Sequence, residues 1–284
     1  MGEVKNLRGG VAVVTGAASG IGLGMAHAFA GEGMRLMLAD IEPAALESAA
    51  ARLRADGAEV VAECVDVSNA DTVEDLAESA FKHYGKVNVV CNNAGVIENN
   101  LATWEYPIED WNWVLGINIM GVVHGIHSFI PRMIDSDEPG HIVNTASLGG
   151  LITGTANPIY IASKHAVVAL SENLHNDLVT RGTKLKVSVL CPGWVRTGIV
   201  DSDRNRENAP HLTEKLGRTR QRFRDGVDSG LEPETVGAMV VDAIVEEQFY
   251  IHTHPGWLDV VRDRFDAIAA GERPATSRIP NPKK

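Results

Sequence analysis

The sequence has little cysteine, little positive charge and few charged residues overall, and each shortage excludes a class of protein. Cys64, Cys91 and Cys191 are too few and too widely spaced for a disulfide framework or a CxxC metal site, so we expect reduced core thiols. Only 26 Lys and Arg oppose 37 Asp and Glu, and the net charge of −11 disfavours nucleic acid and anionic membranes as partners. Charged residues make up 22% and hydrophobic ones 44%, which excludes disorder as the main state.

A long stretch without Lys, Arg, Asp or Glu covers residues 9–31, and its length alone would permit a membrane span. Seven glycines interrupt it, and its pattern changes midway from a β-branched run to helical spacing, so we expect a strand, a loop and a helix. Residue 6 is Asn, where a myristoylation signal requires Ser or Thr. We therefore expect a cytoplasmic protein with no export signal and no membrane anchor.

Seven short apolar runs alternate with amphipathic stretches, a pattern typical of a parallel sheet covered by helices on both faces. The expected strands are residues 11–14, 35–39, 60–65, 87–91, 141–144, 187–190 and 249–252. The expected helices are residues 21–30, 44–55, 73–84, 108–134, 159–180 and 234–247. The sequence thus predicts an α/β fold, doubly wound around a seven-stranded parallel sheet.

Two segments fall outside this alternation. Residues 201–230 are polar without strong periodicity, which predicts an irregular active-site lid at about 200–230. Neighbouring acids nearly balance the arginines of residues 218–224, so we expect these arginines on a solvated or intersubunit face, the alternative being contact with an anionic substrate. Three prolines beyond residue 271 predict a flexible tail over 271–284. No linker or repeat divides the remainder, and we expect one domain over residues 1–270.

The first expected strand leads directly into a glycine-rich turn and then a helix, Thr15-Gly16-Ala17-Ala18-Ser19-Gly20-Ile21-Gly22. Gly16 permits a tight turn, Gly20 lets the backbone approach a phosphate, and Gly22 lets helix and strand pack closely. The helix N-terminus adds N–H donors and a positive dipole end. The turn therefore predicts a dinucleotide pyrophosphate site, although any tight strand-to-helix turn favours glycine.

Asp40 directly follows the second expected strand, twenty residues beyond Gly20. A carboxylate there can bind both hydroxyls of an adenosine ribose and would repel a 2′-phosphate. No basic side chain stands at Ser19 or Ile41 to offset that charge. We therefore predict NAD in preference to NADP, the alternative being a solvated carboxylate at a strand end.

Further motifs follow in a fixed order. They are Cys91-Asn92-Asn93-Ala94-Gly95, Asn118, Ser147, Tyr160-Ile161-Ala162-Ser163-Lys164 and Pro192-Gly193. Over about residues 7–255 this set resembles the single-domain branch of the short-chain dehydrogenase/reductase family. The resemblance implies a Rossmann-type fold with NAD at the carboxyl edge of the sheet, and a homotetramer or homodimer.

Tyr160 and Lys164 are four residues apart, so on a helix they share one face. A phenol is a poor base at neutral pH, but a nearby ammonium favours the phenolate. Ser147 lies close enough along the chain to orient the same substrate oxygen. The resemblance implies that Asn118 holds the water of a proton relay, completing the catalytic set Asn118, Ser147, Tyr160 and Lys164. Taken singly, each of these residues is better explained by a structural role, and it is their occurrence together and in order that favours catalysis.

By the same resemblance, other positions bind the cofactor. Asp66 and Val67 flank the adenine, and Asn93, Ala94 and Gly95 line the adenosine side. Val195 and Thr197 hold the nicotinamide carboxamide, next to Pro192 and Gly193 at the sheet edge; Tyr160 and Lys164 also contact the cofactor. Two pairs of histidines, His124 with His127 and His252 with His254, have no third Cys, His or carboxylate to complete a ligand set, so we expect no metal site.

These motifs predict an NAD-dependent oxidoreductase that transfers hydride between NAD and a secondary alcohol or ketone. Residues 148–157, residues 194–199 and the lid together contain a mixture of Ile, Val, Leu and Trp, which predicts a bulky apolar, aryl or alicyclic substrate. Their arrangement looks similar to that of bacterial relatives that oxidise such alcohols. The alternatives are a non-catalytic NAD-sensing or scaffold protein and a ketone or acyl-thioester reductase. No GxSxG elbow surrounds Ser147, which disfavours a serine hydrolase.

Overall fold

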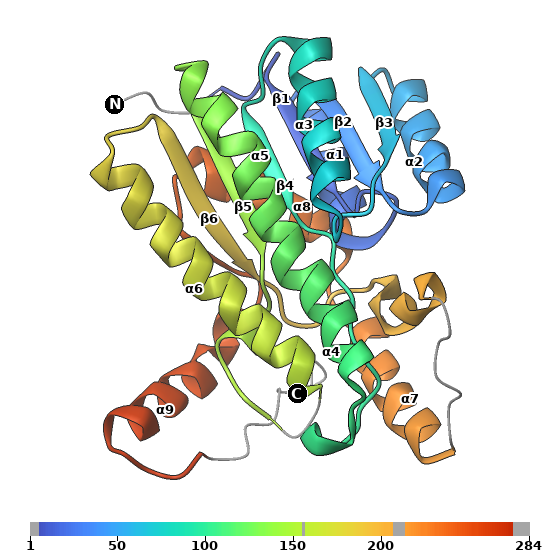
Figure 1. Cartoon of the computed structure of the whole chain (residues 1–284), viewed down its shortest axis with the longest axis vertical. Coiled ribbons are helices and arrows are strands. Elements are labelled where there is room, and N and C mark those ends of the chain that lie inside the picture. Colours follow the sequence, from blue (N-terminus) through green and yellow to red (C-terminus); the bar gives the residue numbers. More distant parts are fainter. Residues whose placement is uncertain (1–5, 155–156, 207–213, 275–284) are drawn as a thin grey trace.

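The computed structural model describes residues 6–154, 157–206 and 214–274 (Figure 1). Seven strands form one parallel sheet in the order β3-β2-β1-β4-β5-β6-β7, so the predicted fold class is confirmed. The strands are β1 (Val11–Thr15), β2 (Arg35–Asp40), β3 (Val60–Cys64), β4 (Val89–Asn92), β5 (Gly140–Thr145), β6 (Leu185–Cys191) and β7 (Tyr250–His252).

The first strand, β1, lies in the interior of the sheet, and later strands are added first on one side of it and then on the other. From β1 the chain moves outward to β2 and β3, then returns to pair β4 with the other side of β1. Val13 in β1 is therefore paired with Met37 of β2 and with Val90 of β4. Loops leave in opposite directions from the carboxyl ends of β1 and β4, which opens a crevice at this switch point.

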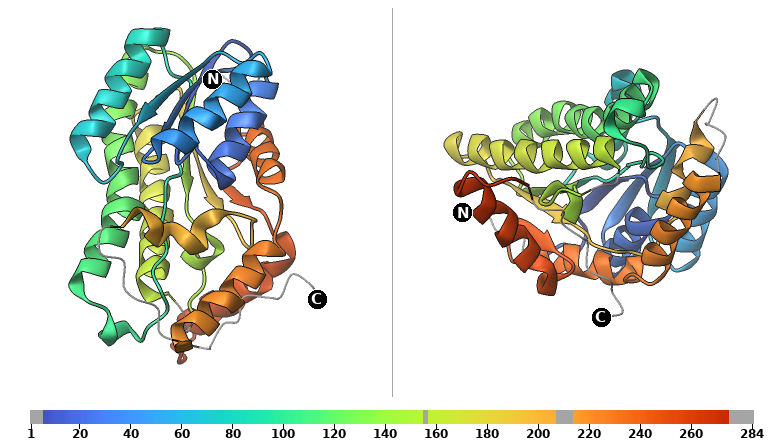
Figure 2. Two further views of the ribbon diagram at one scale, coloured as in Figure 1. Left: turned by 90° about the vertical axis from the view of Figure 1, so that its right-hand side faces the viewer. Right: turned by 90° about the horizontal axis from the view of Figure 1, so that it is seen from below.

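Helices cover both faces of the sheet (Figures 1 and 2). One face carries α1 (Gly20–Gly31), α2 (Pro43–Ala55) and α8 (Pro233–Val245). The other carries α3 (Ala70–Tyr84), α5 (Gly121–Asp135) and α6 (Pro158–Thr180), while α4 (Ile108–Leu115) precedes α5 and packs against α6. Alternate strand residues supply the two layers: Val14 packs with Phe29 of α1, and Val13 packs with Phe129 of α5. This is why the central strands are apolar throughout.

Helices α1 and α8 touch through backbone. A Cβ atom on Gly24 would lie 2.2 Å from the carbonyl oxygen of Pro233, and one on Gly237 would lie 2.2 Å from that of Gly24. No side chain fits between the two helices at this crossing. The contact supports α1 from behind, and α1 is the helix whose N-terminus faces the crevice.

The helix expected over 108–134 is divided in two. A π-helical turn, η2 (Gly116–Met120), separates α4 from α5. By length and composition alone, Ile108–Asp135 could span a membrane, and 44% of its most apolar window is buried within the protein. It packs against α3, α6 and β4, as a helix of the core does.

Residues 201–230 are not irregular as predicted. They contain most of a 3-10 helix, η4 (Gly198–Asn205), and all of α7 (Glu214–Asp228). Helix α7 packs inward through Phe223, which lies edge-on against Trp194, and through Val227, which is buried. Polar residues dominate its sequence, which is why the segment was interpreted as irregular.

Two further predictions also differ from the structure, those for Leu258–Ala269 and for Cys64. Helix α9 (Leu258–Ala269) was not predicted because it buries no residue. Cys64 is exposed, not a core thiol, because it is the last residue of edge strand β3; Cys91 and Cys191 are buried. Short 3-10 turns occur at η1 (Thr103–Glu105), η3 (Leu148–Gly150) and η5 (Pro255–Trp257). Residues 207–213 of the predicted lid and residues 275–284 of the predicted tail lie outside the described residues.

Candidate active site

A pocket of about 730 Å³ opens at the carboxyl ends of β1, β4, β5 and β6. Among the site residues predicted from sequence, the following line it: Gly16, Ser19, Gly20, Ile21, Asp40, Asp66, Val67, Asn93, Ala94, Gly95, Ser147, Tyr160, Lys164, Pro192, Gly193, Val195 and Thr197. Gly22 and Asn118 do not line the pocket and support it from behind. The structure therefore brings together residues that are up to 181 positions apart in the chain.

The wall beside β1 is made of backbone. Gly16 and Gly20 have φ of +65° and +55°, a region that favours glycine. A Cβ on Gly22 would lie 2.1 Å from the carbonyl oxygen of Gly16, so the start of α1 rests directly on the turn. Ser19 is the N-cap of α1, yet its side chain makes no capping hydrogen bond. Backbone N–H groups at a helix N-terminus suit an anion, and this cradle fits a dinucleotide pyrophosphate.

Asn93 joins the ends of three strands. Its backbone N–H donates to Thr15 Oγ1 at 2.9 Å and its Nδ2 donates to the Thr15 carbonyl at 2.9 Å. Thr145 Oγ1 donates to Asn93 Oδ1 at 3.2 Å. These bonds hold the turn after β4 against the glycine turn, where a Cβ on Gly16 would lie 2.9 Å from Ala94 Cα.

Asp40 is anchored at the end of β2 by backbone. Its Oδ2 accepts the Ala18 N–H at 2.9 Å and its Oδ1 accepts the Glu42 N–H at 3.0 Å. Burial raises the pKa of Asp40, and the bond from Ala18 opposes that rise. At the next strand end, Asp66 Oδ1 accepts the Ser68 N–H at 2.9 Å, and the neighbouring Val67 is buried. Both carboxylates thus border the part of the pocket beside the glycine turn.

Tyr160 and Lys164 stand in the first turns of α6 and face the pocket together. Lys164 is 3% exposed; its Nζ donates to the Thr145 carbonyl at 2.8 Å and lies 5.6 Å from the centre of the Tyr160 ring. Burial raises the pKa of Tyr160 to about 12, although the hydrogen bond with the Ser147 hydroxyl lowers it in part. Burial lowers the pKa of Lys164 to about 8. In the protein alone, Tyr160 is therefore neutral and Lys164 is mostly an ammonium at pH 7.

Ser147 follows β5 and begins η3. Its Oγ accepts the Gly149 N–H at 3.0 Å and donates to the Pro192 carbonyl at 3.4 Å. These two bonds orient the hydroxyl between the ends of β5 and β6, on the pocket wall that also carries Tyr160.

Asn118 lies in the π-helical turn and is fully buried. Its Oδ1 accepts the Val96 N–H at 2.9 Å, and its Nδ2 donates to the Val96 carbonyl and to Ser163 Oγ, both at 3.0 Å. A Cβ on Gly95 would lie 3.3 Å from both Asn118 Oδ1 and Lys164 Nζ. Asn118 thus links the segment after β4 to α6, and the water expected on it stays a prediction.

Sequence reasoning missed three long-range contacts of the site. Glu98 caps the start of α6, Ser202 of η4 bonds to Ile97, and Glu42 accepts hydrogen bonds from Arg204 and from Asn205 Nδ2, the latter at 3.0 Å. None of these residues belongs to a motif, and no periodicity relates the partners. Only a three-dimensional arrangement could have revealed them.

The prediction for the arginines of residues 218–224 is wrong for Arg220. Its side chain is 15% exposed, lines the pocket, and donates to Asp203 Oδ2 at 2.8 Å and to Asp201 Oδ1 at 2.9 Å. Arg224 also donates to Asp201, at 2.8 Å from its NH1 to Oδ2. These pairs connect α7 to η4 and make the pocket wall there electrically balanced.

Comparisons with known proteins agree with this geometry. A family model described as short chain dehydrogenase matches residues 10–208. The 1-deoxy-11-beta-hydroxypentalenate dehydrogenase of Streptomyces arenae is 38% identical, over 90% of this chain and 86% of that protein. The 3beta-hydroxysteroid dehydrogenase 2 of Eggerthella lenta is 34% identical, over 68% of this chain and 74% of that protein.

The solved structures include a short chain dehydrogenase/reductase from Burkholderia phymatum in complex with NAD. It is 42% identical with a TM-score of 0.93, covering 96% of this chain and 99% of that one. The chain therefore belongs to the short-chain dehydrogenase/reductase family, and it is an oxidoreductase of the dehydrogenase class that acts on a small-molecule substrate.

Proposed function

We propose that the protein transfers hydride between NAD and a bulky apolar secondary alcohol or its ketone, with Tyr160 as the general acid/base. The observation that carries the proposal is the convergence of Tyr160, Lys164 and Ser147 on one pocket wall beside Thr145. The nicotinamide, when bound, accepts or returns the hydride. In alcohol oxidation Tyr160 takes the hydroxyl proton, and in ketone reduction it donates that proton back.

Each neighbour has a separate role. The ammonium of Lys164, held 5.6 Å from the Tyr160 ring centre, favours the phenolate against the burial that opposes it. Ser147 donates to the substrate oxygen and orients it. Asn118 positions Val96 and Ser163 and thereby the wall on which Lys164 stands.

NAD is the proposed cofactor, and NADP is disfavoured. The part of the pocket beside Gly16, Asp40 and Asp66, called here the cofactor half, carries a carboxylate anchored by two backbone N–H groups. Asp40 is well placed to accept the ribose hydroxyls and would repel a 2′-phosphate. The NAD complex of the relative from Burkholderia phymatum supports the same choice.

The substrate is proposed to be an alicyclic or aryl alcohol. The part of the pocket beyond Tyr160, called the substrate half, is lined by apolar side chains from five segments: Ile97, Trp113, Ile152, Trp194, Ile199 and Phe223. Arg220 is neutralised there by Asp201 and Asp203. The names of the pentalenate and steroid dehydrogenases support a rigid ring system as the substrate.

A ketone reductase is the second candidate, and one observation favours it. Burial raises the pKa of Tyr160 to about 12, so the phenol retains its proton and is ready to donate it. The same residues serve both directions, and the direction followed in the cell depends on the ratio of reduced to oxidised cofactor.

A homotetramer or homodimer is proposed as the assembly. Large apolar side chains are exposed on α6 and α9, where Val179, Phe265 and Ile268 are each more than half exposed. Light scattering during size-exclusion chromatography tests this proposal, and a monomer at micromolar concentration would contradict it.

The function is tested with one titration and one substitution. The protein is titrated with NAD and NADP, and reduction of NAD is then followed with panels of steroid, alicyclic, aryl and short aliphatic alcohols. Tyr160→Phe should lower kcat by at least about 100-fold, because it removes the proton acceptor, while the Kd for NAD stays within roughly 2-fold. Substantial turnover in the Phe variant, or turnover of short sugars alone, would contradict the proposal.

A further inference from the structure

The N-terminus of α6 has no cap from its own sequence. Its N-cap residue, Asn157, has φ of +52° and makes no side-chain capping bond; its Nδ2 instead donates to the Glu98 carbonyl at 2.6 Å. Pro158 has no N–H. The first free N–H groups of the helix are therefore those of Ile159 and Tyr160, and they need an acceptor from elsewhere.

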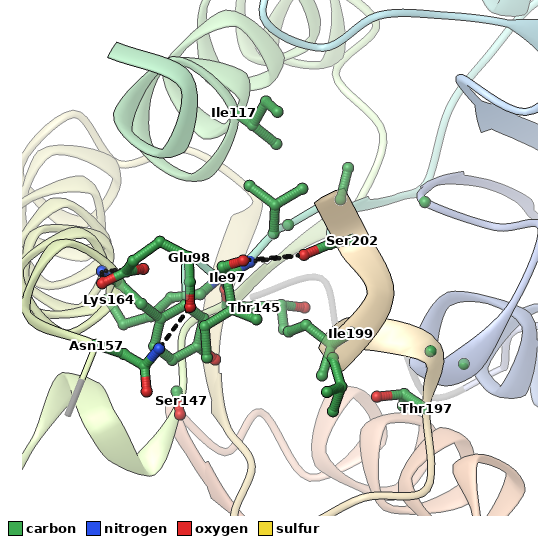
Figure 3. Close-up of a pocket in the computed structure, with 18 of the residues that line it drawn as sticks. Ile97, Glu98, Ile117, Thr145, Ser147, Asn157, Lys164, Thr197, Ile199 and Ser202 are labelled. Carbon is green, nitrogen blue, oxygen red and sulfur yellow. Dashed lines mark hydrogen bonds between the residues drawn. The ribbon is translucent and has the colours of Figure 1, made fainter. Parts of the chain in front are cut away.

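Glu98, in the segment after β4, supplies that acceptor. Its carboxylate is 62 positions before Tyr160 and receives the Tyr160 N–H at 3.1 Å on Oε2 and the Ile159 N–H at 2.9 Å on Oε1. The side chain belongs to a residue only 5% exposed and lies beside Asn157 in the pocket (Figure 3). Both donors are N–H groups at the positive end of a helix, which favours the ionised carboxylate although burial raises its pKa.

The same short segment also contacts two other elements of the site, η2 and η4. Val96 exchanges two hydrogen bonds with Asn118 in the π-helical turn. Ile97 donates from its N–H to Ser202 Oγ at 3.0 Å, and its carbonyl accepts from that hydroxyl at 3.2 Å (Figure 3). Residues 96–98 thus join η2, η4 and the start of α6 in consecutive positions.

We propose that Glu98 is a positioning residue for Tyr160: its carboxylate caps the start of α6, and so fixes where Tyr160 stands in the pocket and brings a negative charge to the first turn of that helix. The proposal rests on the proposed function, in which Tyr160 exchanges a proton with the substrate oxygen. A cap from the segment after β4, unlike one from Asn157, ties the phenol to the wall that carries Asn93 and Gly95.

The charges around this pair are few. Tyr160 faces Lys164 on α6, Ser147 after β5 and the Cys191 thiol on β6, which burial keeps neutral by raising its pKa to about 12. Glu98 faces the phenol of Tyr106 and, on α4, Asp110, which is paired with Arg206 at 2.6 Å. Among these groups, Glu98 is the negative charge left without a cationic partner, and it raises the pKa of Tyr160.

Two variants separate position from charge. Glu98→Ala removes both acceptors and should lower kcat for alcohol oxidation by roughly 10- to 100-fold, because small misplacements of a reacting group cost that much. The KM for the alcohol and the Kd for NAD should stay within roughly 2-fold of wild type. Glu98→Gln keeps one oxygen acceptor without the charge, so it should recover much of kcat and move the acid limb of the pH profile of kcat to lower pH.

Glu105→Ala is the matched control. Glu105 is an acid in the same connection between β4 and α4, exposed, and it accepts only the local Ala102 N–H at 2.9 Å. Its removal should leave kcat and the pH profile unchanged. If Glu98→Ala does not fold, Glu98→Gln carries the test. The phenolate absorbance of the NAD complex, taken as the difference from Tyr160→Phe, gives the same pKa comparison without turnover.

The outcomes are distinct. Wild-type kcat and an unshifted pH profile in both Glu98 variants would overturn the inference while leaving the proposed function intact. If kcat and NAD affinity fell in parallel, with no pH shift in Glu98→Gln, Glu98 would have a general structural role, and the inference would also be overturned. Turnover by Tyr160→Phe would instead overturn the proposed function.

Discussion

The cofactor half of the pocket is made mainly of backbone, whereas the substrate half is held by side chains that reach across the chain. Beside β1, the turn from Gly16 to Gly22 packs so closely that a methyl group would overlap a carbonyl oxygen. Beyond Tyr160, contacts such as Ile97 with Ser202 join residues 105 positions apart. Backbone that is tightly packed tolerates almost no change, whereas side-chain contacts can be altered one at a time. The two halves should therefore respond differently to substitution.

The largest effect is expected in the cofactor half. Gly22→Ala puts a Cβ 2.1 Å from the Gly16 carbonyl oxygen, so the turn must open. Overpacking of this kind costs about 3 kcal/mol, or roughly 100-fold in the Kd for NAD measured by calorimetry. Gly31→Ala, at the end of the same helix with nothing within 4 Å, is the control and should bind NAD normally. Equal affinity in the two variants would contradict the pyrophosphate assignment.

An intermediate effect is expected at Asp40. Asp40→Asn keeps the shape but removes the charge that the Ala18 and Glu42 N–H groups anchor. The Kd for NAD should rise by about 10-fold, as for loss of one charged hydrogen bond, and the preference over NADP should shrink. Asp56→Asn, an exposed position at the end of α2, should change neither constant. Unchanged selectivity in Asp40→Asn would remove Asp40 from the ribose site.

The smallest effect is expected in the substrate half. Ser202→Ala leaves the buried Ile97 N–H without its partner, at a cost of about 1–3 kcal/mol. Part of that cost should appear as a several-fold lower kcat/KM for the alcohol, with an unchanged Kd for NAD. Ser229→Ala removes only a local bond to the Gly226 carbonyl at 2.9 Å and is the control. A change in NAD affinity in Ser202→Ala would show that the two halves are coupled.

The strands that were predicted correctly are buried on both faces, whereas the missed elements lack a distinctive apolar pattern. All seven strands lie within two residues of expectation at both ends, because buried parallel strands are apolar on both faces. Helices α7 and α9 were missed because α7 is mainly polar, with Phe223 and Val227 as the apolar residues that pack inward, and because α9 buries no residue. The π-helical turn was missed because it lies within a continuous helical stretch, where the period of the apolar residues does not reveal a local change of backbone hydrogen bonding.

Within the site too, residues with a local sequence signal were predicted and those without one were missed. Gly16, Asp40, Tyr160 and Lys164 were predicted to lie at the pocket because the roles proposed for them require a residue type at a fixed distance from a strand or helix end. Arg220 was assigned to the wrong environment, since the acids that pair with it also balance it in a sequence count. Balanced charge in the sequence does not distinguish a solvated face from a pocket wall.

The amino-acid sequence suffices to predict the order of strands and helices, the glycine turn and the spacing of Tyr160 and Lys164, because these follow from local conformation and from burial along single elements. It does not reveal which side chains meet across elements: Glu98 at the start of α6, Ser202 on Ile97, and Arg220 between Asp201 and Asp203. A hydrogen bond needs its two atoms about 3 Å apart, and residues far apart in the chain reach that distance only after the whole sheet has brought its loops to one edge.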